Sequence, residues 1–259
     1  MKDASPEENE PRSPRQSPAA GQLPQSISSA DLEQQIAELK LQLQADADAG
    51  RVWERLGMLE LARDRRQAAL HALETASLLV PLTHRGQLAL AACYAASGFP
   101  ESARAIYRHL AAAIHFETDL LADLADGLGR VGEHELALAV CRDAAQRMPG
   151  VAAPLLGIAR HLRRLRRPAA TVLPYLARAF ELDPTNTECR ISLAWMLHAC
   201  GRSADGAELL DSVAVAEVEC VPSLTRMRRV FVAAEDEYCA SVCKYRLEAL
   251  AAQRWRERP

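Results

Sequence analysis

Two groups of side chains in this sequence have types and spacing that suit binding chemistry: a pair of thiols and a cluster of arginines. Cys239 and Cys243 stand one helical turn apart, so both thiols would face one side of a helix and have the spacing to hold a metal or to oxidise. Neither a histidine nor a third cysteine lies near them in sequence. We therefore interpret both as packing residues and predict no metal site and no cofactor.

The arginine cluster occupies residues 160–167, which read RHLRRLRR. Leu162 and Leu165 take the apolar face of the expected helix, so the guanidinium groups point elsewhere. Arginine pairs bidentately with carboxylates, and a nearby tryptophan such as Trp195 would be a strong anchor. The cluster therefore suits an acidic or aromatic peptide. A solvated basic helix end is the alternative interpretation.

Catalytic motifs are absent from the sequence. It has no GxSxG, no P-loop, no GxGxxG after a strand and no HExxH. Seven histidines are scattered, and none pairs with Cys or Asp at a recognised spacing. We predict that the protein is not an enzyme, and an enzyme with an unrecognised site is kept as a minor alternative. The histidines are His71, His84, His109, His115, His134, His161 and His198.

The charge balance argues against a global affinity for nucleic acid. The chain has 259 residues, with 31 Lys and Arg against 34 Asp and Glu, a net charge of −3. Nucleic-acid binding would need a local basic patch, so the 160–167 cluster supports it only as an alternative function. Arginine far outnumbers lysine among the basic residues, and alanine is abundant, which is typical of a GC-rich bacterial genome.

The first 27 residues differ in composition from the remainder. They are rich in Pro, Ser and acidic residues and have no apolar stretch, so we predict a disordered tail over 1–27 rather than a signal peptide. A run of about 18 apolar residues occurs nowhere in the chain, so we predict no membrane span. The seven cysteines are odd in number and irregularly spaced, which favours a reducing, cytoplasmic location.

Self-similarity at a period of 34 organises the rest of the chain. Leu56-Gly57, Leu90-Ala91 and Leu124-Ala125 recur at this spacing, Ile158-Ala159 continues it, and Leu193-Ala194 follows after a one-residue slip. Further positions keep the same phase: a glycine after the pair, then a small residue, then a proline that closes the unit. These are Gly98, Gly132 and Gly201, then Ala69, Ala103, Ala137 and Gly206, then Pro81, Pro149 and Pro184.

Each unit is predicted to be two antiparallel helices. In the second unit, Gly98 can adopt a left-handed conformation and end the first helix. Ala103 stands where the two helices would cross, and a larger side chain there would push their axes apart. A proline after the second helix lacks the amide that would continue it.

The pattern resembles the tetratricopeptide repeat family over residues 50–217. This resemblance implies an all-α fold, a right-handed superhelical solenoid of about five helix-turn-helix repeats, and non-catalytic binding of proteins as its default use. The fourth unit departs from the family pattern because an arginine-rich turn replaces the glycine. The signature residues are Trp53, Leu56, Gly57, Ala69, Pro81, Tyr94, Gly98, Gly132, Pro149, Pro184 and Gly201.

Capping helices are expected on both sides of the array, because a terminal repeat leaves one face bare. Residues 28–49 are predicted to hold an N-terminal capping helix, with an apolar stripe that includes Ile36 and Leu39. Residues 218–259 are predicted to form two C-terminal capping helices, of which the last ends in the polar sequence RWRERP.

The resemblance also implies where a partner would bind. In the family's packing, the first helix of each unit lines the concave groove, so an unidentified peptide or protein, expected to be acidic, would bind there. Self-association through the capping helices is an alternative, and the sequence does not specify the oligomeric state. The groove residues predicted in this way are Asp126, Arg130, Arg160, Arg163, Arg164, Trp195 and His198.

Overall fold

The computed structural model describes residues 29–113 and 116–256, and within these ranges it is helical without any strand. The predicted disordered tail lies outside the described residues. The helices are α1 (Ser29–Ala45), α2 (Gly50–Ala62), α3 (Arg66–Leu79), α4 (His84–Ala96), α5 (Pro100–Ala111), α6 (Leu121–Arg130), α7 (His134–Arg147), α8 (Ala152–Arg164), α9 (Ala169–Leu182), α10 (Thr187–Ala199), α11 (Ser203–Leu210), α12 (Val221–Ala233) and α13 (Glu237–Arg256), with 3-10 turns at η1 (Thr118–Leu120) and η2 (Val215–Glu217).

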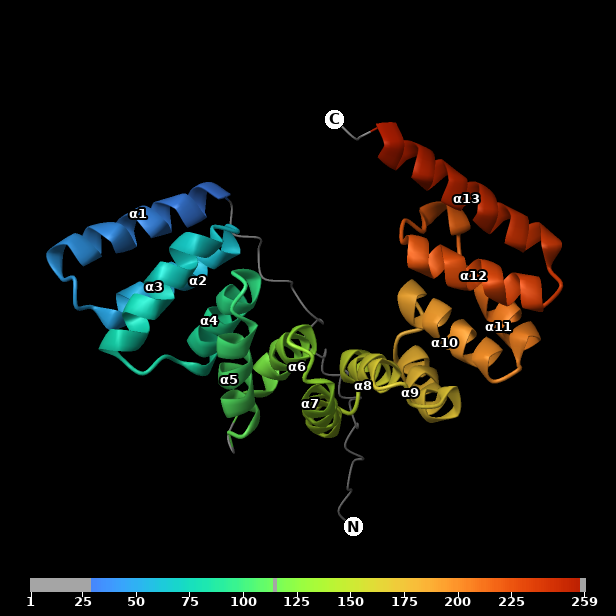
Figure 1. Ribbon diagram of the computed structural model, residues 1–259, viewed down its shortest axis with the longest axis horizontal. Helices are drawn as coiled ribbons and strands as arrows, with labels where there is room; N and C mark the ends of the chain where they lie inside the picture. Colours follow the sequence, from blue (N-terminus) through green and yellow to red (C-terminus); the bar gives the residue numbers. More distant parts are fainter. Residues whose placement is uncertain (1–28, 114–115, 257–259) are drawn as a thin grey trace, which may run out of the picture.

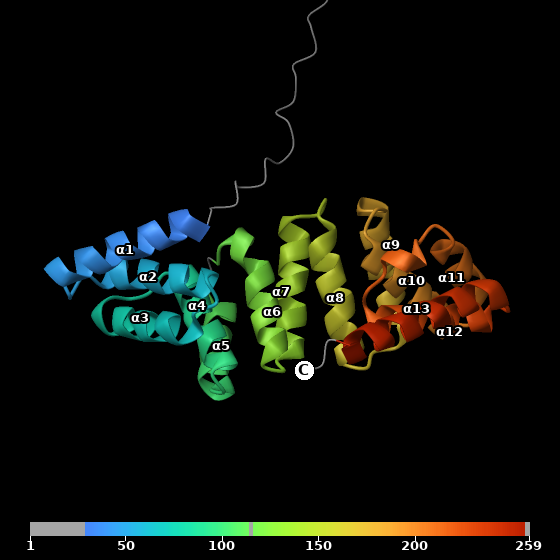
Figure 2. The same cartoon turned by 90° about the horizontal axis from the view of Figure 1, so that it is seen from above.

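From α2 onward, the helices pair into hairpins that follow one another along a curved row. Figure 1 shows an arch whose ends, α1 and α13, rise on the same side, with α6, α7 and α8 at its middle. Figure 2 shows the helices from α4 to α11 following one another along the long axis in chain order, with α1, α2 and α3 together at one end. First helices of neighbouring hairpins also pack on one another, as α2 does on α4, α4 on α6, α6 on α8 and α10 on α12. The predicted all-α helical-repeat solenoid is confirmed.

One turn geometry joins the two helices of every hairpin. The last helical residue and its C-cap are followed by a residue with positive φ, such as Gly98 at 85°. The next amide N–H then bonds back to the carbonyl five residues earlier, as Phe99 does to Tyr94 over 2.9 Å. This is the Schellman arrangement, which satisfies carbonyls that the helix end would otherwise leave unpaired.

The left-handed residues keep the sequence period. They fall 34 residues apart, except for one step of 35 in the fourth unit, and only half of them are glycine. A side chain at positive φ is strained by about 1–2 kcal/mol, so three turns hold a residue that the geometry disfavours. The six residues are Asp64, Gly98, Gly132, Arg166, Gly201 and Glu235.

Small side chains mark the helix crossing where the sequence predicted them, in every unit of the array except the fourth. Ala69, Ala103 and Ala137 are fully buried at this point. In the fourth unit the chain has one more residue between the turn and the second helix, and the fully buried Val172 takes the place of the small residue. This extra residue accounts for the step of 35.

The two ends of the array are closed in different ways. At the N-terminal end, α1 buries Ile36, Leu39 and Leu43 against the first hairpin. At the C-terminal end, α12 and α13 form a hairpin whose turn has the same geometry as the others, with Glu235 at φ 62°. The outer surface of α13 is less polar than the RWRERP ending led us to expect, because Tyr238, Tyr245 and Trp255 are exposed on it.

A buried carboxylate fixes the junction of the first and second hairpins. Glu54 of α2 is only 3% exposed, and its Oε1 accepts the backbone N–H of Thr83 at 2.8 Å as well as the Thr83 hydroxyl. Thr83 is the N-cap of α4, and its Oγ1 accepts the N–H of Gly86. Arg51 donates to the other carboxylate oxygen of Glu54. The first hairpin thereby sets where the next helix begins.

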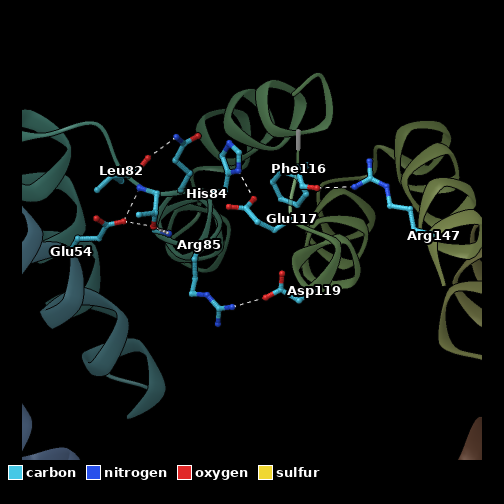
Figure 3. Close-up of polar contacts among 11 residues, drawn as sticks. Glu54, Leu82, His84, Arg85, Phe116, Glu117, Asp119 and Arg147 are labelled. Carbon is cyan, nitrogen blue, oxygen red and sulfur yellow. Dashed lines mark hydrogen bonds and ion pairs between the residues drawn. The ribbon is translucent and has the colours of Figure 1, made fainter. Parts of the chain in front are cut away.

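Figure 3 shows that polar contacts continue across the next junctions. Arg85 of α4 donates to Asp119 of η1 at 2.9 Å, and the ring of His84 lies against Glu117. Arg147 of α7 donates to the carbonyl of Phe116 at 2.8 Å. These contacts attach residues 116–120, which lead into α6, to α4 of the second hairpin on one side and to α7 of the third hairpin on the other.

The turn geometry predicts opposite effects of glycine at two equivalent positions. Arg166→Gly should raise the free energy of unfolding by about 1 kcal/mol, because glycine adopts positive φ without the Cβ strain. Gly132→Ala should lower it by about 1 kcal/mol. Urea denaturation followed by circular dichroism measures both. Equal destabilisation by the two substitutions would contradict the assignment of strain to Arg166.

The Glu54 junction predicts a stability difference that depends on pH. Burial alone would raise the pKa of the Glu54 carboxyl, but hydrogen bonds from Thr83 and Arg51 outweigh it and lower the pKa below its ordinary value of 4.5. Glu54→Gln should therefore cost about 2 kcal/mol at pH 7. The difference should be fully present above pH 4.5 and disappear as pH falls through the lowered pKa.

The matched control for that prediction is Glu208→Gln, which removes the same charge from an exposed position of α11. Its effect on the unfolding free energy should stay within about 0.5 kcal/mol. Unfolding titrations of the three proteins between pH 3 and pH 7 compare them. A difference between wild type and Glu54→Gln that stays constant down to pH 3 would refute the proposed role of the ionised carboxylate.

Candidate functional site

The surface formed by successive first helices contains an apolar pocket of about 360 Å³. We call this the apolar pocket. It opens between α2, α4 and α6, and charged side chains stand at its rim. The apolar lining comes from Met58, Leu61, Ala62, Leu88, Ala89 and Ala92, and the rim from Arg85, Asp123 and Arg130.

Tyr107 of α5 also lines the apolar pocket, and a glycine makes room for it. A Cβ at Gly127 would lie 2.4 Å from the ring carbon Cε1 of Tyr107, so only glycine fits beside the ring. The side chain is 2% exposed. Burial raises the pKa of the Tyr107 hydroxyl, while the charge of Arg130 acts in the opposite direction. The phenol is therefore a neutral hydrogen-bonding group at the wall of the pocket.

A second pocket, of about 410 Å³, lies between the third and fourth hairpins. We call this the basic pocket, and it shares Arg130 with the apolar pocket. Three guanidinium groups and one carboxylate line it, so its charge is positive. Its lining residues are Asp126, Gly129 and Arg130 of α6, His134 of α7, and Arg160, His161 and Arg164 of α8.

The charged groups of the basic pocket are only partly paired with one another. Arg160 forms an exposed ion pair with Asp126, with Nη1 and Oδ1 2.6 Å apart. Arg130 donates from Nε to the backbone carbonyl of Asp126 at 3.4 Å, a long hydrogen bond. Within the described part of the chain, neither Arg130 nor Arg164 forms an ion pair. Two of the three arginines are therefore available for an anion.

Two histidine rings close the buried end of the basic pocket. The ring centroids of His134 and His161 are 5.6 Å apart, and the rings are tilted by 35°. His161 is 2% exposed, and neither of its ring nitrogens has a hydrogen-bond partner in the described structure. The Nδ1 of His134 is buried without a partner as well. Buried polar atoms without partners are uncommon and call for an explanation.

The structure brings together four of the seven predicted groove residues. Asp126, Arg130, Arg160 and Arg164 share the basic pocket. Arg163 is half-buried and lies near Glu188 and Arg226 instead. Burial and the like charge of Arg226 lower the pKa of its guanidinium, whereas the carboxylate of Glu188 raises it.

The other two predicted groove residues, Trp195 and His198, pair with each other in the fifth hairpin. Their ring centroids are 5.1 Å apart. Trp195 also packs against the hydrophobic core on both sides of its helix. The Nδ1 of His198 lies 2.9 Å from the hydroxyl of Ser203, so this ring joins α10 to the start of α11.

The repeat-signature residues lie in the packing and turn positions of the hairpins. Leu56, Gly57 and Ala69 are buried. Each of the three prolines, Pro81, Pro149 and Pro184, comes two residues after the end of its helix, α3, α7 or α9. Trp53 is half-buried rather than fully enclosed, and its Nε1 donates to the carbonyl of Ala47 at 2.8 Å. Tyr94 is also half-buried and donates its hydroxyl to Glu74.

Sequence reasoning missed the two histidines of the basic pocket, although a signal was present for one of them. His161 stands three residues after the start of the repeated pair in its unit. The same position in the other units is apolar or small, so a buried histidine was predictable there. Those equivalent residues are Leu59, Cys93, Gly127, Met196 and Val230.

The thiol pair in α13 does not have the properties of a reactive site. Cys243 is fully buried, Cys239 is half-buried, and neither takes part in a disulfide within the described residues. Burial raises the pKa of each thiol to about 11, so both are protonated at neutral pH. Ligand atoms of Asp211, Asp236 and Cys239 approach one another, but Asp236 already accepts the backbone N–H of Cys239 as the cap of α13.

Among the described helices, none combines the length and apolar character needed to cross a lipid bilayer.

Comparisons with known proteins match the fold but find no sequence relative. Neither the protein-family models nor the curated proteins include one that matches this chain. Among solved structures, PilF of Pseudomonas aeruginosa is similar at a TM-score of 0.64 with 19% identity, over 81% of this chain and 97% of that one. A tetratricopeptide repeat protein from Parabacteroides merdae is similar at 0.62 with 14% identity, over 85% and 87% of the two chains.

A third similar structure is YrrB, which is described as a tetratricopeptide repeat protein with an unusual peptide-binding site. Its TM-score is 0.56 at 13% identity, over 80% of this chain and 97% of that one. These likenesses and the 34-residue helix pairs define the class: the protein is a helical-repeat solenoid. Its fold is, more specifically, that of the tetratricopeptide repeat proteins, as the sequence pattern predicted.

The close approach of Tyr107 to Gly127 generates a further prediction. Gly127→Ala should lower the free energy of unfolding by about 1–3 kcal/mol, because the added methyl group overlaps the aromatic ring. Gly150→Ala is the matched control, since its Cβ would meet no atom within 4 Å. Thermal unfolding compares the two. If both variants unfold at the wild-type temperature, the ring does not need the glycine.

Proposed function

We propose that this protein is a non-catalytic interaction scaffold that binds a peptide or protein segment along the surface of its first helices. By the family resemblance, this surface would be the concave side of the array. The observation that carries the proposal is the apolar pocket, which Leu88 and Ala89 of α4 line together with Met58 of α2 and Asp123 of α6. Such a pocket suits one apolar side chain of an extended segment, with polar groups at the rim to orient it.

Charged residues around the apolar pocket would contact the parts of the bound segment that lie outside the pocket. Arg85 and Asp123 are on the rim, and Arg130 connects the rim to the basic pocket. A segment lying from α4 towards α8 would therefore pass from an apolar site to a positively charged one. The proposed partner-contacting residues remain Asp126, Arg130, Arg160, Arg163, Arg164, Trp195 and His198, to which we add the lining of the apolar pocket.

The proposal is tested with peptides selected from a random displayed library against the wild-type protein. Binding of a selected peptide is measured by fluorescence anisotropy. The double variant Ala62→Gln with Ala89→Gln fills the apolar pocket with polar side chains and should weaken binding at least about tenfold, equivalent to about 1.4 kcal/mol. Both alanines are only partly buried or exposed, so the helices should still form.

The matched control is Leu78→Asp, which changes a strongly exposed leucine on α3. Because α3 is the second helix of its hairpin, it is not part of the proposed binding surface. The substitution should leave the affinity within about twofold of wild type, since an exposed substitution away from the site perturbs little. Equal loss of affinity in the control and in the pocket variant, or no loss in either, would refute binding at the apolar pocket.

A further inference from the structure

The basic pocket concentrates departures from the repeat pattern. Arg130 and Arg164 are the last residues of α6 and α8. The first helix of each of the other four hairpins ends in alanine instead. The same pocket holds His161, at the position that is apolar or small in every other hairpin. The four alanines are Ala62, Ala96, Ala199 and Ala233.

Packing alone does not account for these three side chains. Alanine closes the equivalent helix end in the other hairpins, so the fold does not need arginine there. An exposed cation near a helix C-terminus stabilises the helix by about 0.3–1 kcal/mol. This effect could account for Arg130 and Arg164, but it does not account for the buried His161. A buried histidine with two unpaired ring nitrogens is costly unless something hydrogen-bonds it.

The surroundings of His161 indicate which ligand would satisfy it. Gly129 gives the ring its space, since a Cβ there would lie 2.8 Å from the ring carbon Cε1 of His161. The charged and titratable groups acting on the ring are Asp126 of α6, His134 of α7, and Arg160 and Arg164 of α8. The cations among them would repel a metal ion and attract an anion. The imidazole can donate one hydrogen bond to oxygen when it is neutral and two when it is protonated, and guanidinium groups bind oxyanions bidentately.

We propose that the basic pocket is an oxyanion site, which in the complex holds an acidic or phosphorylated side chain of the bound segment. The oxyanion would lie between the guanidinium groups of Arg130 and Arg164, neither of which forms an ion pair in the described part of the chain, and would accept a hydrogen bond from His161. The Asp126–Arg160 ion pair sets the boundary of the site on the side of α6. The assignment of the anion to a peptide rests on the proposed function, whereas the existence of the site does not.

The site is tested with sulfate, which keeps its double charge between pH 5 and pH 8. The imidazole resonances of the full-length protein are followed by NMR as sodium sulfate is added, with sodium chloride at equal ionic strength as the reference. Sulfate should shift the His161 resonances along a saturable curve, and the resonances of the exposed His109 should not follow it. A linear drift of both histidines with concentration would overturn the proposal.

The variants restore the residues that the other hairpins use. Arg130→Ala with Arg164→Ala should weaken sulfate binding at least tenfold while keeping the fold, because alanine occupies these positions in the other four units. Arg142→Ala, on the exposed surface of α7, removes a single guanidinium elsewhere and should leave sulfate binding unchanged. Unchanged binding in the double variant would exclude the site.

The histidine has its own signature in the pH dependence. Burial lowers the pKa of His161 below its ordinary value of 6.5. The neighbouring His134, Arg160 and Arg164 lower this pKa further, whereas Asp126 raises it. An anion favours the protonated ring, so sulfate should raise this pKa and bind more tightly as pH falls from 8 to 5. Each unit of pKa increase corresponds to about tenfold tighter binding. His161→Met, the residue of the fifth hairpin, should abolish this dependence, and its persistence would refute the role of His161.

Competition distinguishes the two sources of the oxyanion. If methyl phosphate displaces sulfate at a lower concentration than acetate does, the site prefers a phosphorylated side chain, and the reverse order indicates a preference for Asp or Glu. Failure of both to displace sulfate would overturn the proposal. Because no partner is needed for these titrations, their failure would leave peptide binding at the apolar pocket standing, and failure of the peptide experiment would leave the oxyanion site standing.

Discussion

The backbone reversal between the helices of each hairpin is the constraint on which the rest of the structure depends. A left-handed residue followed by a hydrogen bond back to the carbonyl five residues earlier appears at Asp64, and again in each later hairpin through Glu235. Because this arrangement fixes where one helix stops and the next starts, every later residue of a unit inherits its position. Leucines reach the core, alanines reach the helix crossing, and arginines reach the same surface in neighbouring units. A shift of one residue in the reversal would move all of them together.

The fold was predictable to the extent that its turns and crossings use residues with special backbone or steric properties. Gly98, Gly132 and Gly201 signalled three reversals, and Ala69 and Ala103 signalled two crossings. The other three reversals use Asp64, Arg166 and Glu235, whose side chains give no such signal, because their conformation is imposed by the packing of the helices on either side. Because Glu235 does not signal a turn in the sequence, we predicted two capping helices at the C-terminal end, and the structure shows that their turn has the same geometry as those of the repeats. The extra residue before Val172 was visible only as a slip in period.

The candidate site was predictable where repeat register alone determines position. Asp126 and Arg160 occupy the same place in consecutive units, and their ion pair follows from that spacing. Register did not predict the local surroundings of two other expected groove residues: Arg163 lies near the charges of Glu188 and Arg226, and His198 lies within hydrogen-bond distance of the Ser203 hydroxyl. The contact of His134 with His161 joins a second helix to the first helix of the next unit. This contact depends on how the third and fourth hairpins pack against each other, and no short sequence motif predicts that packing.

The placement of the buried thiols has a practical consequence for following the motions of the array. Cys93, Cys141, Cys189 and Cys243 belong to four different hairpins, and burial raises the pKa of each. A thiol in this state reacts with a labelling reagent only after its surroundings open. Each cysteine is therefore a built-in reporter of the opening of its own hairpin, so that labelling rates along the chain would map where the solenoid frays and whether neighbouring units separate together or one at a time.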